Sequence, residues 1–177
     1  MRKDLSKGTS VTSVVKFKDP SRRVAELLES GTPVEDVVKL FKDMLIGVQR
    51  VEGNIFLQEG INFIWLAVTG EPGLTYFRNN SCIGVGDGTE SEDPSQTGLV
   101  GTNKTYKQVD GGYPKLSGTQ VTFRATFGPD EAVHAWQEWT VANSCSDNAI
   151  NLNRKVANLG VKSADATWVL EVTLSIS

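Results

Sequence analysis

Glycines occupy every second position from Gly84 to Gly88, in the stretch SCIGVGDGTESEDPSQTGL that covers residues 81–99. A loop that binds the phosphates of a dinucleotide has the pattern G-x-G-x-x-G between a strand and a helix, so that backbone N–H groups face the anion. Here Thr89 stands in place of the third glycine, acidic residues follow, and Pro94 would interrupt a helix. The stretch therefore predicts a short strand that ends in a glycine turn and an exposed acidic loop.

The same acidic loop offers oxygen donors for a calcium ion. Its carboxylates come from Asp87, Glu90, Glu92 and Asp93. The D-x-[DN]-x-[DN]-G order of an EF-hand is absent, so a calcium loop is kept only as the alternative to a solvated turn.

Few other side chains could catalyse a reaction. Neither His134, the one histidine, nor Cys82 is flanked by a pattern that supplies an oxyanion loop or an orienting acid. Cys82, Cys145 and His134 also lack the paired spacing of a metal site. Glu131 and Glu138 could act as the two carboxylates of a glycoside hydrolase, but two acids on a polar strand face are usually solvated. We therefore expect no catalytic residue, no cofactor and no metal.

Two tryptophans point to binding rather than catalysis. Trp136 and Trp139 are an odd number of residues apart, so a regular strand would place one inward and the other outward. An outward tryptophan could stack on a sugar, cover the helical part of its own chain or fill a subunit interface. Interfaces are enriched in tryptophan and no polar sugar-binding cluster lies beside these two, so we favour a subunit contact.

Length and composition indicate a globular chain of one domain with an appendage, or of two small units. The two cysteines form no C-x-x-C pair, which fits a reducing cytoplasm, although a single bridge between them stays open. The start, MRKDLSKGTSVTSVVKF, lacks the apolar region of a signal peptide, and no stretch approaches the length of a membrane span. We therefore expect a soluble protein that is not exported by the usual route and that has no membrane partner.

Positive charge is concentrated at the start of the chain. Seven lysines and arginines precede residue 24, against two aspartates, whereas acids outnumber bases from Val51 onward. A basic leader that is rich in serine and threonine and has few large apolar residues cannot bury enough surface to fold alone. We expect residues 1–20 to form an extended N-terminal arm that becomes ordered against a partner; a solubilising tail is the alternative. Nucleic acid is not favoured as the partner, because the leader has one aromatic residue, Phe17, and the body is acidic.

Helical patterns follow between residues 21 and 70. Ser21 is a candidate cap for a first helix, which Gly31 ends. The sequence TPVE at residues 32–35 combines a capping box with a proline at the first helical position, and it starts a second, amphipathic helix. A third helix is expected from residue 54 to residue 68, with Gly70 as its stop. The apolar stripes of these helices predict contacts in a core or between subunits rather than a cofactor site.

From residue 71 to residue 177 the apolar residues alternate as they do in strands. The strongest strands are expected at residues 120–127 and 167–177, where Phe123 and Trp168 would face inward. Weaker candidates, separated by turn clusters such as DGGYP and NSCSDN, are residues 82–85, 105–109, 135–142 and 150–156. Parallel strands would need helical crossovers, for which the spacing leaves no room. The expected fold class is mainly β, with an antiparallel β-sandwich or jelly-roll at residues 71–177 preceded by the helical segment (21–70) and the extended N-terminal arm (1–20).

The later two thirds of the chain resemble a known group of proteins. The order IGVGDGTESEDPSQTGL, TNKTYKQVDGGYP, VTFRATFGPDEAVHAWQEWTVAN and NLNRKVANLGVKSADATWVLEVTLSIS is similar to that of small β-rich structural proteins, head decoration or tail-associated, of tailed bacteriophages. GNIFLQEGINFIWLAVTG resembles the helix that introduces their β-rich module. The resemblance covers residues 53–177 and does not extend to residues 1–50. Its motifs are structural, so it implies a virion component and no catalytic residue.

The resemblance implies a virion protein that is assembled in the host cytoplasm. We expect a capsid decoration or cement protein that binds the major capsid protein or other virion proteins as a homo-oligomer, with a trimer as one candidate. The alternative is a tail, baseplate or fibre component with a carbohydrate-binding β-sandwich, although a fibre would more often show longer heptad repeats. An extended arm would add contact area across neighbouring subunits. The residues expected to bind the partner are Arg2, Lys3, Lys7, Val14, Val15, Lys16, Phe17, Lys18, Arg22, Arg23, Trp136 and Trp139.

Overall fold

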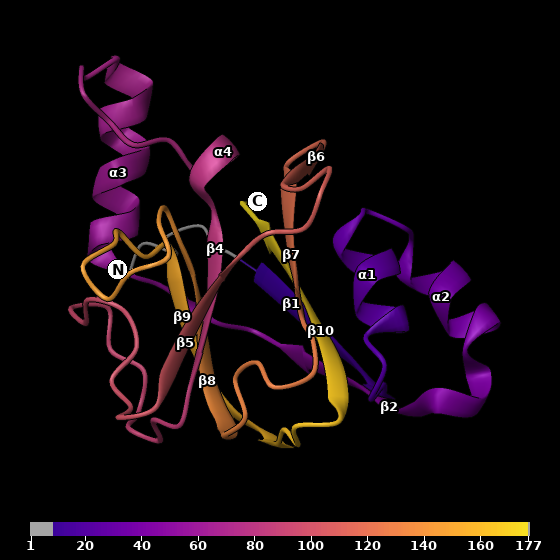
Figure 1. Ribbon diagram of the computed structural model, residues 1–177. Helices are drawn as coiled ribbons and strands as arrows, with labels where there is room; N and C mark the ends of the chain where they lie inside the picture. Colours follow the sequence, from indigo (N-terminus) through magenta and orange to yellow (C-terminus); the bar gives the residue numbers. More distant parts are fainter. Residues whose placement is uncertain (1–8, 177) are drawn as a thin grey trace.

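Two antiparallel sheets of five strands each dominate the computed structural model, which describes residues 9–176 (Figure 1). The first sheet has the strand order β2-β1-β10-β7-β6, and the second has the order β3-β9-β8-β4-β5. Neighbouring strands in both sheets are antiparallel. The fold is therefore mainly β, as the sequence predicts.

The strands of the first sheet are β1 (Thr9–Lys18), β2 (Leu45–Glu52), β6 (Lys115–Ser117), β7 (Gln120–Phe127) and β10 (Ala166–Ser175). Those of the second are β3 (Ile55–Phe56), β4 (Cys82–Gly86), β5 (Lys104–Gln108), β8 (Ala135–Ala142) and β9 (Asn153–Val161). Among the described residues the helices are α1 (Arg23–Glu29), α2 (Val34–Leu40), α3 (Gln58–Thr69) and α4 (Phe77–Asn80), with a 3-10 turn, η1 (Lys42–Met44). All six strands predicted from the sequence are present, with shifts at the ends of four.

Strand β1 occupies the place where the sequence predicts an extended arm. It lies between β2 and β10 and pairs with both, so residues 9–18 are an interior strand of the first sheet. Val14 and Phe17 are fully buried. The expectation of an arm is therefore wrong for this segment, because its apolar residues are covered by its own chain on both faces. Residues 1–8, which include Arg2, Lys3 and Lys7, lie outside the described residues.

One hydrophobic core joins the two sheets. The rings of Phe127 and Trp168, from the first sheet, each lie 4.9 Å from the ring of Trp136 in the second sheet. A smaller cluster covers the opposite face of the first sheet, where α1 and α2 pack on Val15 and Val169. Strands β2 and β3 come from the segment 21–70 and pair with β1 and β9. The boundaries expected at residues 20 and 70 therefore do not separate structural units.

The helices begin and end differently from the sequence expectation. Ser21 does not cap α1; instead Asp19 Oδ2 accepts hydrogen bonds from the Ala25 N–H (3.0 Å) and the Thr167 hydroxyl (2.8 Å). Residues 32–35 contain no side-chain cap, and the second helix ends at Leu40. The third begins at residue 58 because residues 55–56 pair with β9, and it ends at Gly70 as predicted.

A disulfide joins Cys82 on β4 to Cys145 in the loop after β8, with Cα atoms 5.3 Å apart. This answers the question of pairing that the sequence leaves open. The bond closes a long segment, since the two cysteines are 63 residues apart in the chain.

Candidate functional site

The loop between β4 and β5, residues 87–103, surrounds a buried carboxylate of the chain itself. Glu138, on β8, is fully buried. Its Oε1 accepts hydrogen bonds from the backbone N–H groups of Gly88 (3.2 Å), Val100 (3.1 Å) and Gly101 (2.7 Å). Its Oε2 accepts one from Arg154 Nε at 2.7 Å. The loop does hold an anion with backbone amides, but that anion is internal.

The spacing of the glycines follows from this close approach. A Cβ on Gly86 would lie 2.7 Å from Glu138 Oε1, and a Cβ on Gly88 would lie 2.4 Å from it. Any side chain at these positions would displace the carboxylate. Arg154 also donates to the carbonyl oxygens of Glu90 and Ser91, so the same ion pair fixes the acidic loop.

Three of the four acidic side chains of this loop, those of Asp87, Glu92 and Asp93, are engaged with separate partners. Asp87 accepts hydrogen bonds from Asn103, and Asp93 accepts them from Ser95. Glu92 lies 3.4 Å from Lys155 Nζ. Within residues 9–176, no three His, Cys, Asp or Glu side chains are grouped so that they could hold a metal ion. The geometry therefore gives the calcium alternative no support.

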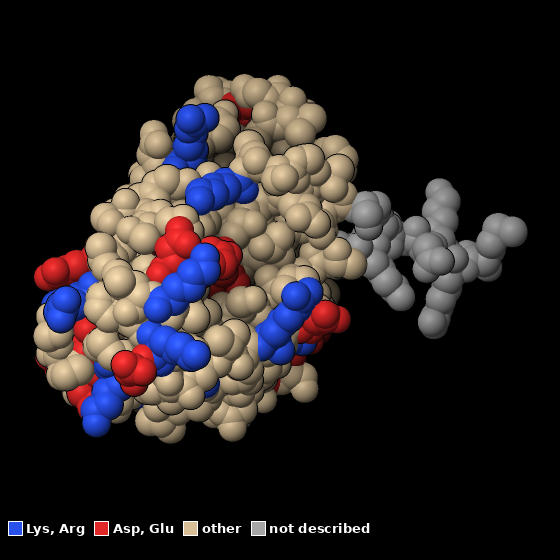
Figure 2. Space-filling model, turned by 90° about the vertical axis from the view of Figure 1, so that its right-hand side faces the viewer, with Lys and Arg blue, Asp and Glu red and all other residues tan. Residues whose placement is uncertain are grey.

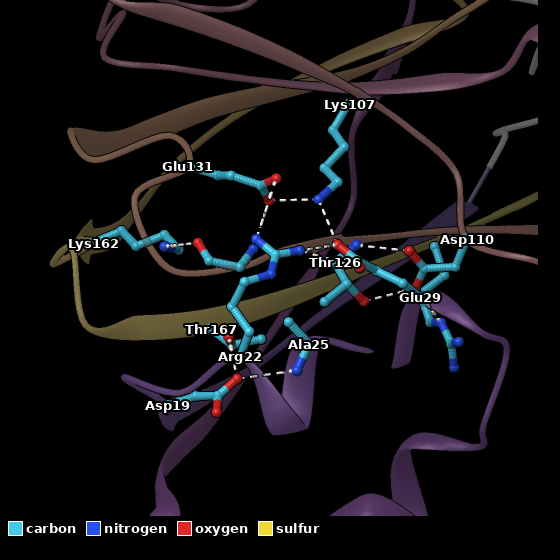
Figure 3. Close-up of polar contacts among 12 residues, drawn as sticks. Asp19, Arg22, Ala25, Glu29, Lys107, Asp110, Thr126, Glu131, Lys162 and Thr167 are labelled. Carbon is cyan, nitrogen blue, oxygen red and sulfur yellow. Dashed lines mark hydrogen bonds and ion pairs between the residues drawn. The ribbon is translucent and has the colours of Figure 1, made fainter. Parts of the chain in front are cut away.

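An ion-pair cluster, made of Arg22, Glu29, Lys107 and Glu131, joins α1 to β5 and to the loop between β7 and β8 (Figure 3). Lys107 contacts both carboxylates, at 2.7 Å for Glu29, and Arg22 contacts them at 3.1 and 3.7 Å. Burial opposes ionisation of Glu131, but hydrogen bonds from Lys107 and from the Gly128 N–H outweigh it and lower its pKa. A carboxyl with a lowered pKa is a poor general acid, so the cluster suits a structural contact.

A second ion pair anchors the end of α1 to the first sheet. Arg124 is fully buried on β7 and donates to Asp110 (2.8 Å), to the Leu28 carbonyl (2.5 Å) and to the Thr32 carbonyl (2.9 Å). Burial raises the pKa of Asp110, while hydrogen bonds from Thr126 and the charge of Arg124 oppose the rise. The guanidinium therefore ties the Leu28 carbonyl, which also accepts the Gly31 N–H at 2.9 Å, and the Thr32 carbonyl to β7.

A fully buried lysine lies close to the ion-pair cluster. The Nζ of Lys162 donates to the Gly128 carbonyl at 2.8 Å (Figure 3). Burial lowers the pKa of Lys162 to about 8. Its one hydrogen-bond acceptor is a backbone carbonyl, so the side chain holds the loop between β7 and β8 in place.

Both tryptophans expected to bind a partner are fully buried in the core. The pairing of β8 with β9 shifts register between Trp136 and Glu138, and this bulge turns Trp136 and Trp139 toward the same side. Trp136 Nε1 donates to the Ala132 carbonyl (3.0 Å), and Trp139 Nε1 donates to the Thr12 hydroxyl (3.1 Å). The prediction that one of them faces outward is wrong.

The other predicted partner-binding residues do not form one surface. Val14, Val15 and Phe17 are buried, and Lys16 lies 4.3 Å above the Trp168 ring. Lys18 and Arg23 are exposed on different elements, while Arg22 belongs to the ion-pair cluster. Figure 2, which views the side of α1 and α2, shows charges of both signs interspersed rather than a basic face. This face of the molecule therefore presents no continuous basic surface.

The strongest candidate for a binding site is an apolar groove of about 730 Å³ between α3 and the end of the first sheet at β6. Figure 1 shows α3 on one side of this end of the molecule and the β6–β7 hairpin on the other. No charged residue lines the groove. Its lining consists of Phe56, Phe63, Ile64, Ala67, Val68, Phe77, Leu116, Gly118, Thr119, Gln120, Val121, Leu152, Leu174 and Ile176.

The sequence predicts one rim of this groove, the helix, but not the other. The apolar stripe of the third helix predicts a core or subunit contact, and the structure leaves half of that stripe uncovered: Trp65 is 62% exposed and Val68 is 71% exposed. The opposite rim includes Leu116, on the three-residue strand β6, which the sequence pattern does not reveal. Only the folding of β6 toward α3 brings the two rims together.

Comparison of the chain with protein-family models, with curated proteins and with solved structures gave no match. Within residues 9–176, no helix combines the length and the apolar character needed to cross a membrane. The function is therefore inferred from the residues and from the geometry of the groove.

Proposed function

We propose that the chain is a non-enzymatic structural protein of a bacteriophage particle, in the role of a capsid decoration or cement protein bound to the major capsid shell. The observation that carries the proposal is the uncharged groove beside α3. A surface of this kind suits contact between proteins, and its lining includes no carboxylate, histidine, lysine or cysteine that could drive a reaction. The resemblance of residues 53–177 to structural proteins of tailed phages supports the particle as its setting.

The use of charge inside the chain agrees with a structural role. The pairs Glu138–Arg154 and Asp110–Arg124 have side chains that are almost completely buried, and both fix loops or helix ends. Groups held in this way rigidify a scaffold. We further interpret the two sheets, which share one core, as a β-sandwich of the jelly-roll kind that the resemblance implies.

A tail, baseplate or fibre component is the alternative, because the resemblance covers both kinds of protein. Its carbohydrate-binding form requires an exposed aromatic platform. Trp136 and Trp139 cannot supply one, since both are fully buried. Trp65 is 62% exposed, but it stands on a stretch of α3, from Gly60 to Thr69, that carries no charged residue to bind sugar hydroxyls beside the ring. We therefore favour decoration of the head.

Particles of the phage that encodes the chain provide the test. Antibodies against the chain should label the head at many positions, and heads that lack the chain should release their contents at a lower temperature or on milder dilution. Adding the purified protein back should restore the resistance. Labelling confined to the tail would replace the proposal with its alternative, and absence from purified particles would refute both.

A further inference from the structure

Helix α3 is attached to the rest of the chain mainly through its N-terminal half. Glu59 Oε1 accepts hydrogen bonds from the backbone and side chain of Asn151, at 2.9 and 3.0 Å. Gly60 lies so close to Leu152 that a Cβ would be 2.6 Å from its Cα. Phe63 contacts Phe77, with ring centroids 5.1 Å apart. A helix of twelve residues is stabilised mostly by packing against other elements. The C-terminal half of α3 lacks such packing within its own chain, so contact with another molecule would stabilise it.

The uncovered half of α3 carries apolar residues with the spacing of a docking helix. Ile61, Trp65 and Val68 follow the pattern i, i+4, i+7, which places them on one flank, and they are 43%, 62% and 71% exposed. From Gly60 to Thr69 no residue is charged. Val68 also lines the groove, so the flank and the groove form one continuous apolar surface.

The opposite rim of the groove is equally apolar. Leu116 is 82% exposed and Ile176 is 53% exposed, and both line the groove. A charged segment placed here would lose its water and find no partner of opposite charge, which costs several kcal/mol. The occupant must therefore be an uncharged apolar segment, and the chain itself contains one in α3.

We propose that the groove binds α3 of a second copy of this chain, so that two copies form a symmetric dimer in which each α3 lies in the groove of the other. A two-fold interface requires a surface that is complementary to itself. Here the convex flank and the concave groove belong to the same copy and share Val68. Figure 1 shows that α3 stands clear of the other elements at this end, so a partner can approach it.

The size of the surface is suitable for a dimer. The exposed parts of Ile61, Trp65, Val68, Leu116 and Ile176 amount to on the order of 500 Å², and a standard interface buries about 800 Å² on each partner. Two such surfaces bury about 1,000 Å² in total, which is the lower end of the range for a specific interface. The biological setting of the dimer rests on the structural role proposed above. In that role, a dimer would give a decoration protein two points of attachment.

Sedimentation equilibrium of the full chain between about 1 and 100 μM provides the test, because this range covers the weak, micromolar end of the affinities of protein interfaces. Val68→Asp and Leu116→Asp place a charge on either rim of the groove. Each should raise the dimer Kd at least about 30-fold, the loss expected at a central contact. Ile46→Asp, at an apolar residue on β2 that is 59% exposed and does not line the groove, should leave the Kd unchanged. All three variants should keep the wild-type circular dichroism, because the replaced side chains are exposed.

Cross-linking locates the contact independently. A mixture of Val68→Cys and Leu116→Cys copies should form mixed disulfide dimers on mild oxidation, whereas Ile46→Cys with Val68→Cys should not. A wild-type chain that is monomeric at 100 μM, or a dimer that both aspartate variants leave intact, would overturn the inference. Binding to neutral phosphatidylcholine vesicles without self-association would overturn it too and assign the surface to lipid. A dimer that is absent from phage particles would refute the virion role alone, and a monomer found on heads would refute the dimer alone.

Discussion

Replacement of Glu138 by glutamine tests the buried ion pair that fixes the glycine-rich loop. The change preserves shape and removes charge, so Arg154, whose side chain is fully buried, loses its counter-ion. Removal of one partner from a buried pair costs about 3–5 kcal/mol. The single amide oxygen of glutamine also cannot satisfy all the donors that face the carboxylate, and a buried unsatisfied donor costs about 1–3 kcal/mol. Because the two effects overlap, we expect the free energy of unfolding to fall by about 4 kcal/mol.

Urea unfolding and thermal unfolding measure this loss. For a chain of this size, the melting temperature should fall by about 8–16 °C. Glu52→Gln is the control, because Glu52 and Arg50 form an ion pair in which both side chains are mostly exposed, and its unfolding should match that of the wild type. Arg154→Met in the Glu138→Gln background should recover part of the loss, since no unpaired charge remains. A loss of less than about 1 kcal/mol for Glu138→Gln would refute the reasoning.

Three further changes have expected outcomes in the same unfolding assays. Gly60→Ala should destabilise the chain by about 2 kcal/mol, because its Cβ would meet the backbone of Leu152, whereas Gly47→Ala, with no atom within 4 Å, should be nearly neutral. Cys145→Ser should cost about 4 kcal/mol, since it reopens a long loop, and a reducing agent should have the same effect on the wild type. Burial lowers the pKa of Lys162 to about 8, so between pH 8 and 10 the unfolded chain binds a proton that the folded chain does not. Unfolding free energy should therefore rise with pH in this window, and the rise should be smaller in Lys162→Met; equal slopes would contradict the assignment.

The parts of the fold that the sequence predicts well are strands with one face toward the core. Strands β7 and β8 have the predicted bounds. Strand β1 escaped prediction because α1 and α2 cover its outer face, so that both Val14 and Val15 are buried and the alternation is lost. Its lysines suggested a solvated segment, yet Lys16 lies over the ring of Trp168 and donates to the carbonyl of Leu159.

The candidate site depends on contacts that lie far apart in the chain. The glycine loop could be recognised as a turn, but the carboxylate that it surrounds comes from a residue 50 positions away from Gly88. The two tryptophans could be placed only once the bulge in β8 was known. The apolar flank of α3 can be recognised in the sequence as a helical stripe. Its exposure cannot, because it depends on which face of the helix packs against Leu152.

The buried ion pair and the groove are connected through the start of α3. Arg154 binds carbonyl groups of the acidic loop, and the carbonyl of Pro94 in that loop accepts the N–H of Gln58, the first residue of α3, at 2.8 Å. Glu59, the next residue, is held by Asn151. The direction in which α3 leaves the sheet is thus set by polar contacts near its N-terminus. The apolar side chains of its C-terminal half are not needed for this attachment. Because these contacts are made within one copy, the groove exists before any partner arrives, and little conformational entropy is lost when a partner binds.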